Sequence, residues 1–250
     1  MKDRAPVALI TGAAGGIGES LVKVFSEAGY RVIAMDYTES GDRLPNVSYL
    51  LADLELYVND ARYADVITDQ ILGLIGDYGL NVLINNAAIQ TLGGVDCLTR
   101  YEWRRSLDVN VTAPFLLSKA LLSPLEQVTG SIINISSIHA RLTKREFVAY
   151  ATSKAALSGL TRAMSVDLGD RIRINAIEPA AIETPMLLAG FSEQPEKYRE
   201  LKSCHSVNRI ATPEEFARFT LAVAAGDYGF MHGACVPFDG GISSRLHDPA

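Results

Sequence analysis

Seven short apolar runs divide the chain, and most of them are separated by segments of helix length. The runs are rich in Val, Ile and Leu instead of alternating with polar residues, which is typical of strands covered on both faces. Strands that alternate with helices predict right-handed crossovers and a parallel sheet. The predicted strands are Val7–Ile10, Val32–Met35, Val47–Leu50, Val82–Ile84, Ser131–Ile135, Arg173–Ile177 and Ala234–Phe238.

Helix signals lie between these runs. Ile17–Ala28 is amphipathic and is followed by Gly29, a common helix stop. The motif TPEE at residues 212–215 combines a capping threonine, a proline at the first helical position and an acidic first turn. We therefore expect an α/β fold, a single doubly wound domain over residues 1–250 with about seven parallel strands and helices on both faces. The one irregular region, residues 184–211, is rich in Met, Leu, Ser and Glu and is a candidate substrate lid.

A glycine-rich loop, TGAAGGIG at residues 11–18, follows the first predicted strand and opens the first predicted helix. Gly12 permits a sharp turn, Gly16 permits close approach of a pyrophosphate, and Gly18 lets helix and sheet pack closely. Free N–H groups and the positive dipole end favour a phosphate at a helix N-terminus. In this context the loop indicates a Rossmann-type dinucleotide site, whereas a glycine triad alone is also compatible with a flexible turn.

An acidic residue, Asp36, ends the second predicted strand, 24 residues after Gly12. A dinucleotide fold places an acid at this distance on the adenosine ribose, where a carboxylate accepts hydrogen bonds from both hydroxyls. The same charge repels a 2′-phosphate, and Tyr37 and Thr38 follow it in place of a compensating cation. The sequence therefore predicts NAD instead of NADP, and the alternative is an aspartate that caps a turn or a helix.

The stretch SSIHARLTKREFVAYATSK, residues 136–154, places a tyrosine four residues before a lysine. Tyr150 and Lys154 therefore share one face of a predicted helix. A free tyrosine has a pKa near 10, and lowering it towards neutrality requires roughly 4 kcal/mol, which a nearby ammonium and an oxidised nicotinamide can supply. Tyr150 could then act as general acid and base for an alcohol–ketone pair, with the Ser137 hydroxyl bonded to the carbonyl oxygen. The alternative is a solvated helix face, which is the commoner origin of a YxxxK pair.

Together these residues resemble the short-chain dehydrogenase/reductase family over nearly the whole chain. TGAAGGIG matches the cofactor loop of that family, and NNAA at residues 85–88 resembles its NNAG. EPAAIETP at residues 178–185 resembles its PG-x-[IV]-x-T segment. Ala88 and Ala180 stand where the family usually has glycine.

The resemblance implies a role for individual residues. Asn110 would interrupt its helix and hold a proton-relay water, and Lys154 would also hydrogen-bond the nicotinamide ribose. The implied catalytic tetrad is Asn110, Ser137, Tyr150 and Lys154, in which Ser137 is preferred to Ser136 because it lies 13 residues before Tyr150. The implied cofactor-binding residues are Gly12, Gly16, Ile17, Gly18, Asp36, Asp53, Leu54, Asn86, Ala87, Tyr150, Lys154, Pro179, Ile182 and Thr184.

Two substrate residues are suggested by a narrower resemblance, to the D-3-hydroxybutyrate dehydrogenases of the same family. In those enzymes a glutamine and a histidine hold the substrate carboxylate, and Gln90 and His139 occupy the matching places. A lysine that assists them is absent here, because Phe147 stands at its position.

The missing positive charge could come from Arg141, Lys144 or Arg145 in the same loop. Arg141 is the preferred candidate because a guanidinium binds a carboxylate through two hydrogen bonds. The alternative is that all three residues are solvated. Glu178 and Glu183 would flank the nicotinamide, where they could pair with this basic loop or contact a polyol hydroxyl.

The predicted function is NAD-dependent interconversion of a small polar secondary alcohol, including a hydroxy acid, and its ketone by hydride transfer. One alternative is a sugar or polyol dehydrogenase. Another is a 3-oxoacyl-type reductase, which Asp36 disfavours because such enzymes use NADPH. A third is a catalytically silent, NAD-sensing interaction protein, which the complete tetrad disfavours.

Composition narrows the setting of this activity. A formal net charge of −6 argues against nucleic acid as a partner, and no apolar stretch approaches the ~20 residues that span a bilayer. Cys97, Cys204 and Cys235 form no CxxC pair, which indicates reduced thiols and a cytoplasmic location. The histidines lack neighbours at metal-ligand spacing, so no metal site is expected. The family resemblance implies a homotetramer formed through the helices that contain Asn110 and Tyr150.

Overall fold

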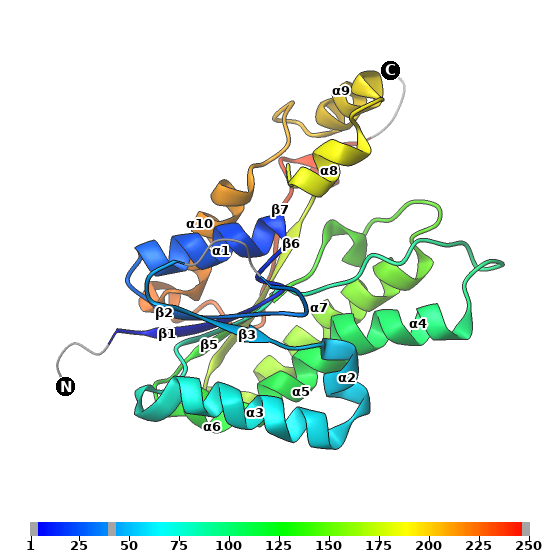
Figure 1. Ribbon diagram of the computed structural model, residues 1–250. Helices are drawn as coiled ribbons and strands as arrows, with labels where there is room; N and C mark the ends of the chain where they lie inside the picture. Colours follow the sequence, from blue (N-terminus) through cyan, green and yellow to red (C-terminus); the bar gives the residue numbers. More distant parts are fainter. Residues whose placement is uncertain (1–4, 40–43, 247–250) are drawn as a thin grey trace.

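The computed structural model describes residues 5–39 and 44–246, which are built around one seven-stranded sheet (Figure 1). All neighbouring strands pair in parallel, in the order β3-β2-β1-β4-β5-β6-β7. The sheet grows outward from β1 to β3 on one side and then from β4 to β7 on the other, as predicted for a doubly wound fold. The predicted strands are confirmed to within two residues at each end: β1 (Val7–Thr11), β2 (Arg31–Asp36), β3 (Val47–Leu51), β4 (Val82–Asn85), β5 (Ser131–Ile135), β6 (Arg173–Pro179) and β7 (Cys235–Phe238).

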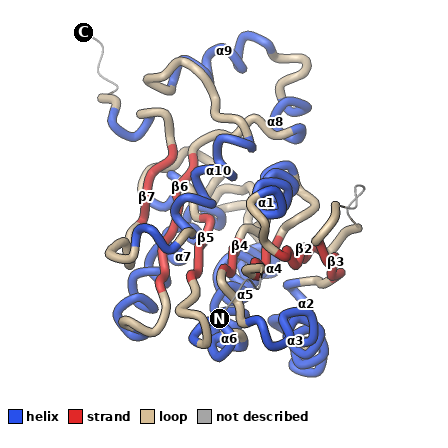
Figure 2. Tube along the Cα trace, turned by 90° about the vertical axis from the view of Figure 1, so that its left-hand side faces the viewer, coloured by secondary structure: helices blue, strands red, loops and turns tan. Residues whose placement is uncertain are grey.

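Helices cover both faces of the sheet (Figures 1 and 2). On one face α1 (Gly16–Glu27) packs beside α10 (Pro213–Ala224), and the other face is covered by α3 (Ala61–Ile75), α5 (Ala113–Ala120) and α7 (Val148–Leu168). The central strands are therefore buried on both sides, which explains their continuous apolar sequence. The other helices of the described residues are α2 (Leu54–Asn59), α4 (Arg100–Leu107), α6 (Leu122–Glu126), α8 (Pro185–Gly190) and α9 (Pro195–Cys204).

The helix ends follow local sequence signals. The Thr212 hydroxyl accepts a hydrogen bond from the Glu215 N–H (3.1 Å), and the Glu215 carboxylate accepts one from the Thr212 N–H (2.9 Å). This capping box satisfies two backbone donors and sets the start of α10. Beyond α1, Gly29 has a φ of +88°, in the left-handed region that glycine adopts easily. The start of α10 and the end of α1 therefore lie where their sequence signals predicted them.

The segment from residue 184 to 211, predicted to be irregular, is largely helical. Helices α8 and α9 extend beyond the carboxyl ends of β6 and β7 (Figures 1 and 2). Each begins with a proline at its first position, Pro185 or Pro195, and the Thr184 hydroxyl caps α8. Neither helix contains a buried residue, so both are held by few contacts with the sheet.

No helix among the described residues has the length and apolar character needed to cross a membrane.

Candidate active site

Several predicted site residues follow the carboxyl ends of the strands. Gly12 follows β1, Asp36 ends β2, Asn86 follows β4, Ser137 lies beyond β5 and Pro179 ends β6. In a parallel sheet these ends form one edge, where ligands of open α/β folds bind. The topology therefore gathers residues that are up to 167 positions apart in the sequence at one edge.

The loop after β1 packs too closely for side chains at its glycines. Gly12 has a φ of +65°, and a Cβ at Gly12 would lie 2.7 Å from the Ala87 Cα. A Cβ at Gly18 would lie 1.9 Å from the Gly12 carbonyl oxygen. A Cβ at Gly16 would lie 2.9 Å from the Pro185 Cδ, a contact that the glycine spacing does not reveal. The sharp turn at Gly12 and the close packing at Gly18 agree with their predicted roles, and Gly16 adjoins the segment after β6.

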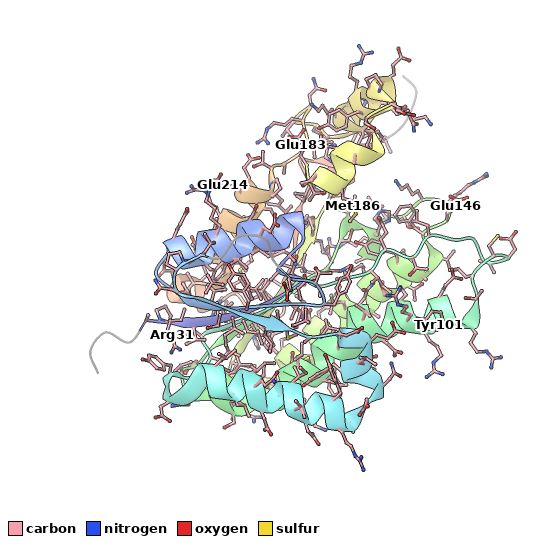
Figure 3. The ribbon with its side chains drawn as sticks, in the orientation of Figure 1. Arg31, Tyr101, Glu146, Glu183, Met186 and Glu214 are labelled. Carbon is pink, nitrogen blue, oxygen red and sulfur yellow. The ribbon has the colours of Figure 1, made fainter. Side chains whose placement is uncertain are left out.

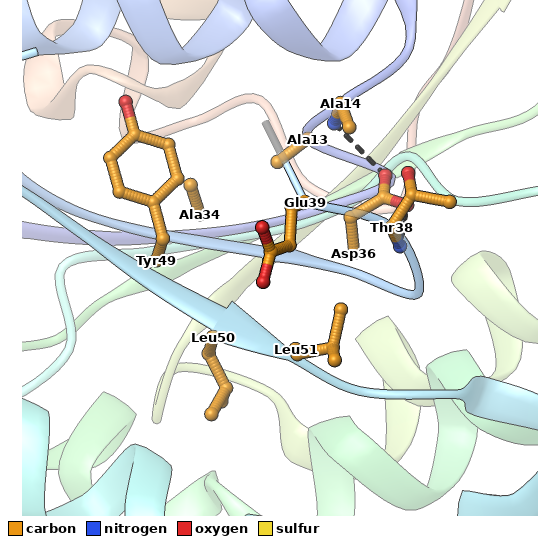
Figure 4. A pocket seen from close by; sticks show the side chains of 9 residues that line it. All are labelled: Ala13, Ala14, Ala34, Asp36, Thr38, Glu39, Tyr49, Leu50 and Leu51. Carbon is orange, nitrogen blue, oxygen red and sulfur yellow. Dashed lines mark hydrogen bonds between the residues drawn. The ribbon is translucent and has the colours of Figure 1, made fainter. Parts of the chain in front are cut away.

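Asp36 lies beside this loop, at a cavity of about 100 Å³ (Figure 4). Its Oδ2 accepts a hydrogen bond from the Ala14 N–H (2.9 Å), and its Oδ1 accepts from the N–H and hydroxyl of Thr38 (both 3.1 Å). Glu39 brings a second carboxylate to the cavity, whose lining contains no lysine or arginine among the described residues. The lining residues are Ala13, Ala14, Ala34, Asp36, Thr38, Glu39, Tyr49, Leu50 and Leu51.

Other predicted cofactor residues have structural roles in this arrangement. The Asp53 carboxylate caps α2 by accepting hydrogen bonds from two backbone N–H groups (2.7 and 3.2 Å), and Leu54 is buried in the core. Neither residue lines the cavity at Asp36. The Asn86 side chain donates to the carbonyl oxygens of Thr11 (2.9 Å) and Gly12 (3.0 Å). Asn86 therefore ties the end of β4 to the glycine loop.

Ser137, Tyr150 and Lys154 converge at the end of β5. The Ser137 side chain lies next to the Tyr150 phenol, and the Lys154 Nζ lies 5.7 Å from the centre of the Tyr150 ring. The Lys154 Nζ also donates to the Ile135 carbonyl oxygen (2.7 Å). The Ser136 hydroxyl instead donates a hydrogen bond to the Lys154 carbonyl oxygen (2.9 Å). This geometry favours Ser137 over Ser136 as the serine that meets a substrate.

Burial dominates the ionisation of this pair. It lowers the pKa of Lys154 from 10.5 to about 7, because the amine is enclosed and its charged form is poorly solvated. Burial also raises the pKa of Tyr150, and the neighbouring Ser137 hydroxyl only partly opposes this. The expected fall in the Tyr150 pKa is therefore not produced by the protein groups, since Lys154 itself loses much of its charge near neutral pH.

Asn110 interrupts a helix as predicted. Residues Asp108–Thr112 form a π-helical turn between α4 and α5. The Asn110 side chain accepts a hydrogen bond from the Ile89 N–H (2.8 Å) and donates to the Ile89 carbonyl oxygen and the Ser153 hydroxyl (both 2.9 Å). Asn110 therefore joins the loop after β4 to α7 at Ser153, the residue before Lys154. A π-turn of this kind is frequent at functional sites.

An aromatic stack forms a wall beside Tyr150. The rings of His139 and Phe147 lie parallel, with centroids 4.5 Å apart, and His139 meets the Tyr150 ring edge-on at 5.7 Å. The Lys144 Nζ lies 4.6 Å from the centre of the Phe147 ring. Burial, and then the charge of Lys144, lowers the pKa of His139, so its imidazole is neutral at physiological pH. The stack is therefore flat and uncharged except at its Lys144 end.

The loop that carries Gln90 lies beside this wall. The Gly93 N–H donates to the Glu146 carbonyl oxygen (2.7 Å), and Gly93 pairs with Phe147 in a short parallel bridge. Gln90 itself is exposed. The two loops that were predicted to hold substrate are thus adjacent, although far apart in the sequence.

Arg141 is bonded to two protein groups. Its Nε lies 2.8 Å from the Glu178 Oε2, and another guanidinium nitrogen donates to the Cys235 carbonyl oxygen (2.9 Å). Two sides of the guanidinium are therefore already bonded to the protein. The pairing of Glu178 with the basic loop is confirmed, and binding of a substrate carboxylate by Arg141 stays a prediction.

The segment after β6 passes close to the glycine loop. Ile182 is buried and bridges to Ala211, and Thr184 lies against Gly16. The hydroxyl of Tyr198 in α9 donates a hydrogen bond to Glu183. Partial desolvation and this bond raise the pKa of Tyr198 to about 12, so the phenol stays protonated across the physiological range. Figure 3 shows Glu183 and Met186 at the base of the part formed by α8 and α9.

The two alanines in glycine positions keep ordinary backbone geometry. Non-glycine residues with positive φ among the described residues are Asn46, Thr129, Glu146 and Asn208, so Ala88 and Ala180 do not have strained geometry of this kind. Within the described part of the chain, no group of three histidine, cysteine or acidic residues could hold a metal ion.

One family model and several known proteins match the chain. The family described as enoyl-(acyl carrier protein) reductase matches residues 12–243. Trans-4-hydroxycyclohexanecarboxylate dehydrogenase of Sinomonas cyclohexanicum is 34% identical over 248 residues, covering 94% of this chain and 92% of the relative.

Solved structures match the fold over a similar extent. Aldohexose dehydrogenase of Thermoplasma acidophilum has a TM-score of 0.90 and 29% identity, covering 99% of this chain and 97% of that one. ElxO with NADP bound and 4-hydroxyisoleucine dehydrogenase with NADH both have TM-scores of 0.87, at 26% and 27% identity. They cover 97% and 96% of this chain, and each matches along its full length.

Proposed function

Because this chain belongs to the short-chain dehydrogenase/reductase family, we propose that it interconverts a secondary alcohol and its ketone with a nicotinamide cofactor. The observation that carries this proposal is the convergence of Ser137, Tyr150 and the buried Lys154 at the sheet edge that also holds the glycine loop. The family assignment rests on the match over residues 12–243 and on the 34% identical relative.

The residues at this edge fit a dinucleotide. Gly12 and Gly18 leave no room for side chains, and α1 begins with no side-chain cap on its first N–H groups, which suits an anion. The cavity at Asp36 offers a carboxylate to a ribose. We propose that Thr184 and Ile182 hold the nicotinamide end and that Lys154 bonds the adjacent ribose.

The chemistry follows from where the polar atoms lie. The cofactor, when bound, supplies the hydride acceptor or donor. We propose that the Ser137 hydroxyl holds the substrate oxygen while the Tyr150 hydroxyl gives or takes the proton on that oxygen. A protonated Lys154 would favour the Tyr150 phenolate, and Asn110 would keep the neighbouring loop and α7 in register.

We propose NAD as the preferred cofactor. Asp36 and Glu39 bring two carboxylates to the cavity where the adenosine ribose would lie, and a 2′-phosphate there would be repelled. Replacing Asp36 by Ala should lower kcat/KM for NAD and raise it for NADP, each by about tenfold, which corresponds to roughly 1.4 kcal/mol per cofactor. A wild-type preference for NADP would contradict this proposal.

We propose a ring-bearing secondary alcohol as the substrate, with a polar or anionic substituent. The flat, neutral stack of His139 and Phe147 beside Tyr150 suits a ring face, and Lys144 is the basic residue at its end. Two related proteins are also named for alcohols that contain or form a ring, a hydroxycyclohexanecarboxylate and an aldohexose. Gln90 and His139 remain the proposed polar contacts.

Initial rates with NAD test the substrate class. The panel contains cis- and trans-4-hydroxycyclohexanecarboxylate, cyclohexanol, an aldohexose, D-3-hydroxybutyrate and an open-chain polyol. We expect the cyclic alcohols to have the highest kcat/KM, and selective turnover of open-chain substrates would refute the ring proposal. Turnover of 3-oxoacyl thioesters with NADPH would favour the reductase alternative, which the family description also fits. Cofactor binding without any turnover would favour the silent, cofactor-sensing alternative.

We further propose a cytoplasmic homotetramer that assembles through α4, α5 and α7. Phe115 on α5 and Val166 on α7 are 43% and 84% exposed in the single chain, and such apolar side chains suit an interface. Leu117 and Leu157, by contrast, are buried within the chain and belong to its own core. Sedimentation as a monomer would contradict the tetramer.

A further inference from the structure

A buried carboxylate lies close to the proposed active site and is not one of the proposed catalytic groups. Glu178 on β6 is 2% exposed. Its Oε1 accepts a hydrogen bond from the Ser158 hydroxyl of α7 (2.9 Å), and its Oε2 pairs with the Arg141 Nε (2.8 Å). A buried charge of this kind is tolerated only with such partners, because an unpaired carboxylate would lose its solvation without compensation.

The carboxylate is connected to the helical turn of Lys154. The Ser158 hydroxyl lies 2.8 Å from the Ser136 hydroxyl, which in turn lies 2.9 Å from the Lys154 carbonyl oxygen. The Lys154 Nζ bonds the carbonyl oxygen of Ile135, the residue before Ser136. The end of β5 therefore contacts both the backbone and the amine of Lys154, and Glu178 orients the hydroxyl next to that contact.

The cationic partner holds the loop in front of Tyr150. Arg141 bonds both Glu178 on β6 and the Cys235 carbonyl oxygen on β7, so the loop is fixed to two strands. His139 lies two residues earlier, in a short 3-10 turn that starts after Ser137. Fixing Arg141 therefore fixes the ring that contacts Tyr150 and Phe147.

We propose that Glu178 and Arg141 are positioning residues for the reaction, which rests on the proposed function. The pair holds the His139 loop against Tyr150, and the Ser158 hydroxyl that donates to Glu178 packs against the Ser136 hydroxyl beside the turn of Lys154. Arg141 therefore acts on the substrate through the protein and does not bind it. The Nε edge of Arg141 is closed to a substrate carboxylate, because displacing it would leave Glu178 buried with one partner fewer.

A double-mutant cycle separates positioning from direct binding. The variants are Arg141→Met, Glu178→Gln and the double variant, assayed with NAD and with one neutral and one carboxylated cyclic alcohol. Positioning predicts that each single variant lowers kcat/KM by about tenfold for both substrates, mainly through KM, and that the double variant is no worse than either single one. Cofactor affinity, measured from NADH fluorescence, should stay within about twofold. Arg141→Lys should recover part of the loss, because an ammonium can still pair with Glu178.

The control is an ion pair at the opposite end of the sheet. Arg171, two residues before β6, pairs with Glu126 at the end of α6, so Arg171→Met should leave kcat and KM unchanged. A loss confined to the carboxylated substrate in Arg141→Met, with Glu178→Gln unaffected, would show direct binding and overturn the proposal. Unchanged kcat/KM in both single variants would overturn it as well.

Two further outcomes are distinguishable. If Arg141→Met does not fold, because Glu178 is left unpaired, the comparison of Glu178→Gln with the neutral double variant carries the test. If the wild-type chain turns over no secondary alcohol, the proposed function fails before the positioning question is reached.

Discussion

Lys154 should make the stability of the fold depend on pH, because its amine is buried. Its pKa is about 7 in the folded chain and 10.5 in an exposed lysine. Between these values the unfolded chain binds a proton that the folded chain does not bind. Raising the pH across this window therefore opposes unfolding, so the free energy of unfolding rises with pH and the gain is complete above the unfolded pKa.

The size of the effect follows from this difference in proton binding. Each pH unit inside the window contributes up to about 1.4 kcal/mol, so the wild-type chain should gain about 2 kcal/mol between pH 7.5 and 9.0 relative to Lys154→Met. Methionine keeps the length of the side chain but cannot titrate. It also leaves the Ile135 carbonyl oxygen without its donor, a cost that is the same at both pH values and does not affect the slope.

Urea unfolding at several pH values, followed by circular dichroism, measures this slope. Lys23→Met on the exposed face of α1 serves as control and should keep the wild-type slope. Equal slopes for the wild type and Lys154→Met would refute the argument that burial deprotonates Lys154 in the folded chain.

The remaining predictions compare two glycines and two serines whose environments differ. Gly18→Ala should lower the free energy of unfolding by about 3 kcal/mol or more, because the new Cβ meets the Gly12 carbonyl oxygen. Gly73→Ala in α3, where a Cβ meets nothing within 4 Å, should raise that free energy by about 0.5–1 kcal/mol. Equal changes in the free energy of urea unfolding for Gly18→Ala and Gly73→Ala would contradict both predictions. Ser137→Ala should lower kcat by about 100-fold with little change in melting temperature. Ser136→Ala should instead lower the free energy of unfolding by about 1–3 kcal/mol, and a larger loss of kcat than in Ser137→Ala would reverse the assignment of the two serines.

The fold could be predicted from the sequence because its elements depend on local patterns. Each buried parallel strand has a continuous apolar run, and α10 begins at a threonine–proline–acid motif that forms the same cap in the structure. The helices in the segment 184–211 were not predicted because both are short and neither buries a residue, so no repeated core-facing positions mark them in the sequence. The signals at their starts are the capping Thr184 before Pro185, and Pro195.

The site could be predicted only in part. The spacing of Ser137, Tyr150 and Lys154 is visible in the sequence. Arg141 and Glu178 are 37 residues apart and meet through tertiary packing, so the sequence predicted their pairing only as one of several alternatives. Ser158 carried no sequence signal, since an isolated serine on a helix is ordinarily a surface or packing residue. The effect of burial on the Lys154 pKa likewise requires the three-dimensional surroundings of its amine.

The most direct test of the proposed chemistry is turnover by Tyr150→Phe. The substitution removes one hydroxyl and leaves the ring that contacts His139 and lies near Lys154. The assay follows the absorbance of the reduced nicotinamide with the best cyclic alcohol of the panel, alongside NADH affinity by fluorescence. We expect kcat to fall by about 1,000-fold or more while NADH affinity stays within about threefold. A variant that retains a substantial part of the wild-type kcat would contradict the assignment of Tyr150 as the proton-transferring group.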